Sequence, residues 1–316
     1  MPDTVLLTSR FAKSMMARFS ARFDLLDTAG KPPEQCFGAD ELGRVRALLT
    51  MGAQPLGAAQ MDRLPSLGAI VCYGTGYDGV DLIEATRRGI VVANSPAANA
   101  SAVADMAMTL LLAVTRRLLA ADEYVRSGGW ANSTPSPMLR APRGLRGRKV
   151  GVYGMGEIGH KIAARAAAFE TEVAYFSRSR HEVPYDYKPS LGDLVDWCDV
   201  LMIAVRAGPE TERIIDAGML KRLGPDGVVV NISRGSVIDQ DALLEALGTN
   251  AIAGAGLDVF AQEPHVPDQL SALPNVVLTP HIGGHTSDAH VAMQDCAIAN
   301  LEAFFAGRPV PYAVVQ

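Results

Sequence analysis

The residues with the clearest chemical potential stand in the middle of the chain, at Gly154-Met-Gly156-Glu-Ile-Gly159. This turn follows the apolar run 150–153 and precedes an Ala-rich stretch with helical spacing. Gly154 permits a tight turn, Gly156 lets the backbone approach a pyrophosphate, and Gly159 lets the helix pack closely on the strand. Unpaired N–H groups at the start of the helix attract phosphates. The pattern predicts a dinucleotide site whose candidate contacts are Gly154, Gly156, Glu157, Ile158 and Gly159.

The end of the next strand indicates which dinucleotide is bound. About 20 residues after the turn, an NAD site places an acid on the ribose hydroxyls. This chain has Ser177-Arg178-Ser179 there, with Arg180 close by. A guanidinium can clamp a 2′-phosphate that a carboxylate would repel, so we expect NADP(H), with Ser177, Arg178 and Ser179 as contacts. FAD and S-adenosylmethionine sites use a similar loop but more usually have an acid at this place.

An Arg, a Glu and a His follow three later strand candidates. Arg234 follows 227–232, Glu263 follows 251–259, and His281 follows 276–279. Because ligands of open α/β sheets bind beyond the carboxyl ends of the strands, we expect these side chains to face one site.

The segments that carry these residues resemble the D-isomer-specific 2-hydroxyacid dehydrogenases. The likeness covers nearly the whole chain, and the run Tyr175-Phe-Ser-Arg-Ser-Arg180 looks most like the NADPH-using glyoxylate/hydroxypyruvate reductases and their hydroxyphenylpyruvate-reducing relatives. The segments in order are Gly74-Thr-Gly-Tyr-Asp-Gly-Val-Asp81, Val103-Ala-Asp-Met-Ala107, Asn231-Ile-Ser-Arg-Gly235, Gly256-Leu-Asp-Val-Phe-Ala-Gln-Glu-Pro264 and Thr279-Pro-His-Ile-Gly283.

The resemblance implies reduction of a small 2-keto acid to the D-2-hydroxy acid by NADPH, with roles that the chemistry supports. His281 is then the proton donor, since imidazole exchanges protons near neutral pH. Glu263 would fix its tautomer and stabilise the imidazolium. Arg234 would bind the substrate carboxylate and polarise the carbonyl.

Further contacts follow from the same resemblance. The turn Gly74-Thr75-Gly76 would offer backbone N–H groups to the substrate carboxylate, and Met51 and Gly52 would line the substrate pocket. By analogy, Asp258 orients the nicotinamide amide. The remaining expected cofactor contacts are Ala204, Val205, Ile232, Ser233, Arg234, His281 and Gly283.

Two positions depart from the family pattern. Arg206 stands where relatives often have a proline, which indicates either a differently shaped cofactor loop or help in phosphate binding. Glu157 stands where relatives often have an arginine, and a carboxylate beside a pyrophosphate is unfavourable unless it points away.

Two other interpretations of the chain are weaker. His281 and His285 have the spacing of a helical metal pair, but Gly283 and Gly284 between them disfavour a helix, so no metal is predicted. A nucleotide-sensing binding protein or co-regulator of the same fold, with little turnover, is the alternative function. The presence of the Arg, Glu and His of the family pattern favours the enzyme.

Composition limits the classes of partner and compartment. The 316 residues carry a net charge of −5, which argues against a nucleic-acid binder. The most apolar window, 102–120, contains Asp105, Arg116 and Arg117, so we expect a buried helix and no membrane span. The four cysteines are scattered, which is typical of a reducing, cytoplasmic setting.

The pattern of elements predicts an α/β protein with two doubly wound domains. A flavodoxin-like substrate domain, 1–97 and 287–316, is expected to contain a Rossmann cofactor domain, 98–286, inserted in its chain. A long helix is expected at 101–126, apolar around too much of its circumference for a surface helix, and buried between domains or at a subunit interface. The resemblance implies a homodimer built largely on that region. The strands expected in the first hundred residues are 5–8, 45–50, 69–73 and 90–93, with a helix at 80–88 and a last helix at 288–305.

Overall fold

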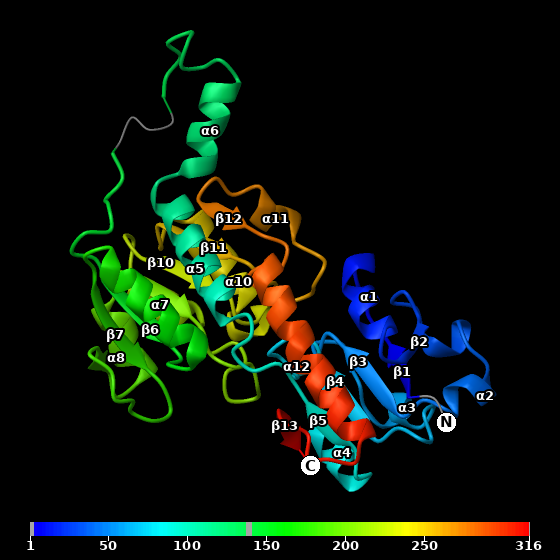
Figure 1. Cartoon of the computed structure of the whole chain (residues 1–316). Helices are drawn as coiled ribbons and strands as arrows, with labels where there is room; N and C mark the ends of the chain where they lie inside the picture. The colour runs from blue at the N-terminus through cyan, green and yellow to red at the C-terminus, as the bar shows by residue number, and fades with distance from the viewer. Residues whose placement is uncertain (1–2, 137–140, 316) are drawn as a thin grey trace. The chain divides into compact units, whose positions relative to one another are not determined.

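The computed structural model describes residues 3–136 and 141–315 and divides into two compact units (Figure 1). Unit 1 comprises Met1–Asn99 and His285–Gln316, and unit 2 comprises Ala100–Gly284. The boundaries expected from the sequence fall after residues 97 and 286. Unit 2 is therefore an insertion in the chain of unit 1.

Unit 1 has, among the described residues, a six-stranded sheet in the order β13-β5-β4-β3-β1-β2. The five strands before β13 are parallel, and β13 pairs antiparallel with β5. The order 2-1-3-4-5 is that of a flavodoxin-like doubly wound sheet, as expected. The strands are β1 (Thr4–Leu7), β2 (Asp24–Asp27), β3 (Ala47–Thr50), β4 (Ala69–Cys72), β5 (Val91–Ala93) and β13 (Ala313–Val315).

The strands β2 and β13 are additions to the elements expected from the sequence. Both lie at edges of the sheet, and β2 reads Asp-Leu-Leu-Asp with none of its residues fully buried. Such a strand lacks the continuous apolar run by which buried parallel strands are found. The helices of unit 1 are α1 (Lys13–Ser20), α2 (Ala39–Leu42), α3 (Ala58–Met61), α4 (Leu82–Arg87) and α12 (Ser287–Phe305), with a 3₁₀ turn at Pro33–Gln35.

Unit 2 has, in the part that the structure describes, a seven-stranded parallel sheet in the order β12-β11-β10-β9-β6-β7-β8. This order is the Rossmann arrangement with one further strand, and the glycine turn follows its first strand, β6. The strands are β6 (Lys149–Tyr153), β7 (Glu172–Phe176), β8 (Asp186–Tyr187), β9 (Val200–Ile203), β10 (Val228–Asn231), β11 (Gly254–Leu257) and β12 (Val276–Leu278). The helices are α5 (Ala100–Thr115), α6 (Leu118–Arg126), α7 (Glu157–Ala168), α8 (Leu191–Trp197), α9 (Ala217–Leu223), α10 (Gln240–Gly248) and α11 (Asp268–Ser271), with a 3₁₀ turn at Gly235–Val237.

The core of unit 2 lies on both faces of its sheet. Along β9, Val200 and Met202 belong to one buried cluster, whereas Leu201 and Ile203 belong to the other. Alternate residues of a strand point to opposite faces, so both faces of a central parallel strand must be apolar. Because of this requirement, the central strands of unit 2 are continuous apolar runs, which the sequence predicts as strands.

The expected helix at 101–126 is wrong in its length. It is divided into α5 and α6 at Arg117, which has the left-handed φ of 49°. The α5 part is buried inside unit 2, where Leu110 contacts Gly256 and Val114 contacts Gly254 of β11 closely enough to leave no room for a Cβ. Its apolar circumference therefore reflects burial within unit 2.

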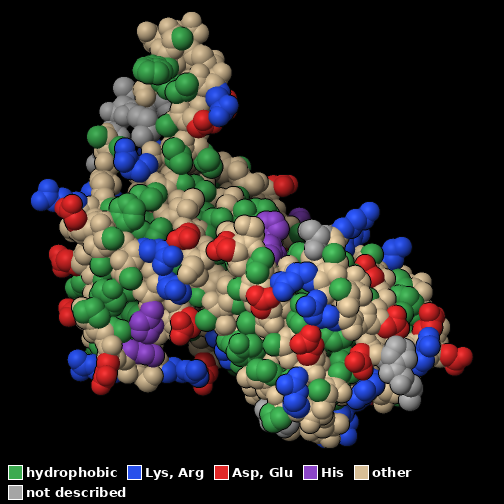
Figure 2. Space-filling model, in the orientation of Figure 1, with side chains coloured by type: hydrophobic (Ala, Val, Ile, Leu, Met, Phe, Trp, Pro, Cys, Tyr) green, Lys and Arg blue, Asp and Glu red, His purple; other side chains and the backbone are tan. Residues whose placement is uncertain are grey.

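The α6 segment leads away from the sheet and has no buried residue (Figure 1). Its apolar side chains Leu118, Leu119 and Val125 are 55 %, 58 % and 53 % exposed. Figure 2 shows hydrophobic side chains on the surface of this segment.

A charged residue of the apolar window 102–120 is paired with another helix of unit 2. Asp105 of α5 forms a 2.6 Å ion pair with Arg165 of α7. Among the described residues, no helix has the length and apolarity needed to cross a membrane.

We expect Gly159→Ala to destabilise unit 2. A Cβ at Gly159 would lie 1.9 Å from the carbonyl oxygen of Gly154, so the helix and the turn would have to separate. Overpacking of this kind costs about 1–3 kcal/mol. Gly248→Ala is the matched control, because a Cβ at that helical glycine meets nothing within 4 Å. Thermal unfolding should show a lower midpoint for Gly159→Ala alone, and equal midpoints would contradict the close packing.

Candidate active site

The glycine turn has the geometry that a dinucleotide requires. Gly154 has a φ of 100°, and a Cβ on it would lie 2.7 Å from the carbonyl oxygen of Ala204. Gly156 is the N-cap of the twelve-residue α7, and a Cβ there would meet nothing within 4 Å. The space beside Gly156 and the unpaired N–H groups of the helix end suit a pyrophosphate. Glu157 is exposed in the first turn of α7.

The loop after β7 carries Arg178, the residue that the sequence assigns to the ribose end of the cofactor. Ser177 is buried, and its hydroxyl donates a 2.6 Å hydrogen bond to the carbonyl of Ser179, which tightens the loop. Arg178 is exposed, as is Arg180. Burial raises the pKa of Tyr153, and the charge of Arg178 opposes that rise, which places the guanidinium near the end of β6. The loop can therefore present a guanidinium to an anionic group.

Arg234 lies in a loop whose backbone is held by hydrogen bonds with neighbouring side chains. The side-chain amide of Asn231 donates to the carbonyl of Arg234 at 2.9 Å, and the hydroxyl of Ser233 accepts from the N–H of Arg234 at 2.6 Å. A Cβ on Gly235 would lie 1.9 Å from the carbonyl carbon of Phe260, so this loop packs directly on the segment that leads to Glu263. Ile232 and Ser233, which precede Arg234, are buried.

Asp258 shapes the segment that carries His281. Its buried carboxylate accepts hydrogen bonds from the Thr279 hydroxyl at 2.6 Å and from the N–H groups of Ile282 and Gly283 at 2.9 and 2.7 Å. The N–H of His281 donates to the carbonyl of Asp258 at 2.8 Å. Residues 279–283 thus wrap around one carboxylate.

His281 and Glu263 form a direct pair. The Nδ1 atom of His281 lies 2.6 Å from Oε2 of Glu263, and Oε1 of Glu263 accepts from the N–H of Phe260 at 3.1 Å. His281 has a φ of 55°, a conformation uncommon for residues other than glycine. The bond at Nδ1 leaves Nε2 without a hydrogen-bond partner among the described residues.

Glu263 is held as a carboxylate by its neighbours. Burial acts to raise the pKa of Glu263, but the hydrogen bond and charge of His281, the N–H of Phe260 and the charge of Arg234 outweigh it and lower that pKa. A carboxylate beside an imidazole stabilises the protonated ring. Because the charge of Arg234 affects the pKa of Glu263, the guanidinium of Arg234 lies near the His281–Glu263 pair.

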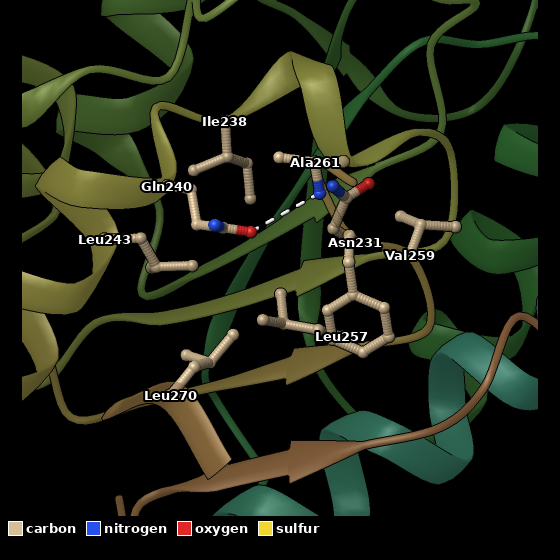
Figure 3. Close-up of a pocket in the computed structure, with 10 residues that line it drawn as sticks. Asn231, Ile238, Gln240, Leu243, Leu257, Val259, Ala261 and Leu270 are labelled. Carbon is tan, nitrogen blue, oxygen red and sulfur yellow. Dashed lines mark hydrogen bonds between the residues drawn. The ribbon is translucent and has the colours of Figure 1, made fainter. Parts of the chain in front are cut away.

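A small, mainly apolar pocket lies behind these loops (Figure 3). It is lined by Gly235, Phe260 and Ala261 from the loops and by leucine and isoleucine side chains, with Gln240 at its edge. The side-chain oxygen of Gln240 accepts from the N–H of Ala261 at 3.4 Å, as the dashed line in Figure 3 marks. Arg234, Glu263 and His281 do not line this pocket, so it supports the loops and is separate from the catalytic candidates.

The substrate-binding candidates lie at the ends of β3 and β4 in unit 1. A Cβ on Gly52 would lie 2.0 Å from the carbonyl oxygen of Gly76, so the two loops meet backbone to backbone. A Cβ on Gly74 would meet nothing within 4 Å, and Met51 is 44 % exposed. The structure therefore brings Met51, Gly52 and the Gly74–Gly76 turn together.

Some residues that position these loops were not singled out from the sequence. The Thr75 hydroxyl lies 2.9 Å from Oδ1 of Asn99, and the Asn94 side chain donates to the carbonyl of Thr75 at 2.7 Å. Neither asparagine lies in a recognisable motif. Thr279 and Asn231 do lie in segments that resemble the family, which is the signal that could have identified them.

The sequence-predicted residues of unit 2 follow the carboxyl ends of its strands. The cofactor candidates follow β6, β7, β9, β10, β11 and β12, and the catalytic candidates follow β10, β11 and β12. Ala204 is tied to the turn by its N–H, which donates to the carbonyl of Tyr153 at 2.8 Å, and Val205 is its neighbour.

Known proteins match this chain over most of its length. Residues 108–283 match the family described as "D-isomer specific 2-hydroxyacid dehydrogenase, NAD binding domain". The hydroxyphenylpyruvate reductase of Plectranthus scutellarioides is 37 % identical over 312 residues, which are 98 % of this chain and 98 % of that protein. The 2-ketogluconate reductase of Gluconobacter oxydans is 42 % identical over 272 residues, 86 % of each chain.

A solved structure gives the same result for the fold. The NADPH-dependent glyoxylate/hydroxypyruvate reductase from Sinorhizobium meliloti, in complex with NADP and malonate, has a TM-score of 0.92 at 36 % identity and covers 98 % of this chain and 96 % of that chain. The strand orders, the glycine turn and the match over more than half of the sequence agree with one another. The chain belongs to the D-isomer-specific 2-hydroxyacid dehydrogenases, a family of nicotinamide-dependent oxidoreductases.

Proposed function

We propose that the chain reduces a small 2-keto acid of the glyoxylate or hydroxypyruvate type to the D-2-hydroxy acid, using NADPH. The observation that carries the proposal is the 2.6 Å pair of His281 and Glu263 beside the Arg234 loop. The names of the relatives support the substrate class, since they include reductases of hydroxyphenylpyruvate, glyoxylate and hydroxypyruvate.

The cofactor candidates fit NADPH. The space beside Gly156 and the start of α7 suit the pyrophosphate, and Ser177, Arg178 and Ser179 suit a 2′-phosphate. Ile158 and Gly283, with Ala204, Val205, Ile232, Ser233 and Asp258, would complete the site. A bound nicotinamide supplies a hydride to C2 of the keto acid. The related S. meliloti reductase, whose structure contains NADP, supports this assignment.

The proton comes from His281. Its Nδ1 is held by Glu263, so Nε2 is the atom that donates to the keto oxygen as that oxygen gains negative charge. The Glu263 carboxylate stabilises the imidazolium before transfer and keeps the ring in one orientation.

Arg234 and the Gly74–Gly76 turn bind the substrate carboxylate. A guanidinium pairs with a carboxylate through two parallel hydrogen bonds, and successive backbone N–H groups add further donors. Met51 and Gly52 would line the pocket for the substrate side chain. Asp258, which orders residues 279–283, would also orient the nicotinamide amide.

We further propose that the chain works as a homodimer. The exposed Leu118, Leu119 and Val125 of α6 support it, because a helix with unburied apolar residues favours association.

We expect wild-type kcat/KM to be about tenfold to a thousandfold higher with NADPH than with NADH, a difference of roughly 1.4–4 kcal/mol. Arg178→Asp should reduce or invert this preference, because a carboxylate repels the 2′-phosphate. The measurement is a panel of 2-keto acids assayed with both cofactors, and retained NADH activity in the variant is the control for folding. Equal use of both cofactors by wild type would refute the assignment, and NADPH binding with no turnover of any acid would favour a sensor.

His281→Ala should lower kcat by about 10²–10⁴-fold, the usual share of general acid catalysis, while NADPH affinity changes little. Arg234→Ala should differ by raising KM for the keto acid strongly while also lowering kcat, because it binds ground state and transition state alike. Steady-state kinetics with NADPH titration by fluorescence separates the two. His265→Ala, an exposed histidine two residues from Glu263, serves as the control. Near-normal turnover of His281→Ala would place the acid elsewhere.

The pH dependence tests the role of Glu263. Reduction requires a protonated His281, so activity should be full at lower pH and fall as rising pH removes that proton. Glu263→Gln removes the negative charge that stabilises the imidazolium and should move the fall to lower pH. Profiles of kcat/KM for wild type, Glu263→Gln and the exposed control Glu245→Gln provide the measurement. An unmoved profile in Glu263→Gln would remove Glu263 from this role.

A further inference from the structure

A chain of two imidazoles and a phenol lies in unit 1, outside the residues assigned above. Nδ1 of His285 lies 2.8 Å from Nε2 of His290 on α12. Nδ1 of His290 lies 3.1 Å from the hydroxyl oxygen of Tyr73, and that hydroxyl also donates to the carbonyl of His290 at 3.2 Å. The histidine rings meet edge to face, with centroids 4.8 Å apart.

This hydrogen-bonded chain of His285, His290 and Tyr73 connects two segments that lie next to candidate site residues. Tyr73 is fully buried and directly precedes Gly74, the first residue of the substrate-binding turn. Its ring packs edge to face on Phe11, with centroids 5.4 Å apart, and its N–H donates to the carbonyl of Thr50 at 2.8 Å. His285 is the first residue of unit 1 after the polypeptide leaves unit 2, and it lies four positions beyond His281.

The contact between the imidazoles depends on a single proton. With neutral rings, one of the two facing nitrogens carries the hydrogen and the other accepts it. If both rings are protonated, two N–H groups and two positive charges face each other across 2.8 Å, and the hydrogen bond is lost. Protonation of both rings would therefore break the chain.

The surroundings of His290 favour its neutral form. Burial and the charge of His285 lower the pKa of His290, so the folded state favours its neutral form. The stability that neutral His290 contributes to the folded state is present above the ordinary histidine pKa of about 6.5. It is lost as pH falls through the lowered pKa of His290. Burial raises the pKa of Tyr73 to about 12, against a hydrogen bond from Gln294 and the charge of Arg18, so the phenol keeps its proton.

Two charged side chains close to these residues, Arg18 and Asp288, already have partners. Arg18 of α1 forms a 2.5 Å ion pair with Asp295 of α12. Asp288, in the first turn of α12, is hydrogen-bonded to Thr286, and this bond lowers the pKa of Asp288.

We propose that His285, His290 and Tyr73 are positioning residues that hold the Gly74–Gly76 turn in its substrate-binding conformation through one shared proton. The proposal rests on the proposed function, in which that turn binds the keto-acid carboxylate. Loss of the chain should weaken binding of the keto acid without affecting proton transfer by His281.

The kinetic test uses Tyr73→Phe, which removes the hydroxyl and keeps the ring. We expect KM for the keto acid to rise about threefold to tenfold, the effect of one ordinary hydrogen bond, with kcat and NADPH affinity nearly unchanged. His285→Asn should raise KM similarly, and the double variant should be no worse than the poorer single variant, because both break one chain. Tyr312→Phe, whose hydroxyl interacts with Cys296 in the same unit, is the control. An unchanged KM in Tyr73→Phe, or multiplicative effects in the double variant, would overturn the proposal.

A second measurement tests, without turnover, whether His285, His290 and Tyr73 are coupled to the Gly74–Gly76 turn. In wild type, the backbone amide resonances of Gly74, Thr75 and Gly76 should shift as pH falls below about 6.5, and Tyr73→Phe should abolish these shifts. This NMR titration requires neither NADPH nor a keto acid. A wild type that reduces no keto acid would refute the proposed function alone, whereas amides that do not respond to pH, or that respond equally in Tyr73→Phe, would refute the link.

Discussion

Asp258 is 2 % exposed, and its carboxylate accepts hydrogen bonds from Thr279, Ile282 and Gly283. A carboxylate is costly to bury unless its oxygens are hydrogen-bonded, so residues 279–283 must wrap around it. That constraint sets the left-handed backbone of His281 and brings its Nδ1 to Glu263. Replacing Asp258 would therefore disturb the His281–Glu263 pair without touching either side chain.

Close backbone packing supplies the rest of the architecture. Gly159 lies against the Gly154 carbonyl, Gly235 lies against the Phe260 carbonyl, and Gly52 of unit 1 lies against the Gly76 carbonyl. At each of these places a Cβ would separate two segments that carry candidate site residues. Side chains such as Asn231 and Gln240 then bond to loop backbone and fix the remaining freedom. The site is thus built mainly by backbone contacts and buried polar side chains, with the reactive groups added to a rigid frame.

The sequence allowed the buried parallel strands and the catalytic candidates to be predicted, for physical reasons. Strands such as β10 must be apolar on both faces, and Arg234, Glu263 and His281 each follow such a strand. The break at Arg117 could not be predicted, because 101–126 contains no glycine or proline and the break reflects where the helix leaves the sheet. The edge strand β2 lacked an apolar pattern. The bonds of Thr75 with Asn99 and of Tyr73 with His290 join residues distant in sequence, so they could not be predicted without the fold.

The most direct test of the central claim is a crystal structure of the protein with NADP and an unreactive 2-keto-acid analogue such as oxamate. We expect Nε2 of His281 to lie within hydrogen-bond distance of the analogue's carbonyl oxygen, with Nδ1 still on Glu263. We also expect the guanidinium of Arg234 to contact the analogue's carboxylate and the 2′-phosphate to lie at Ser177–Arg178. A structure in which His281 faces away from the carbonyl oxygen, or in which the carboxylate is bound without Arg234, would contradict these roles.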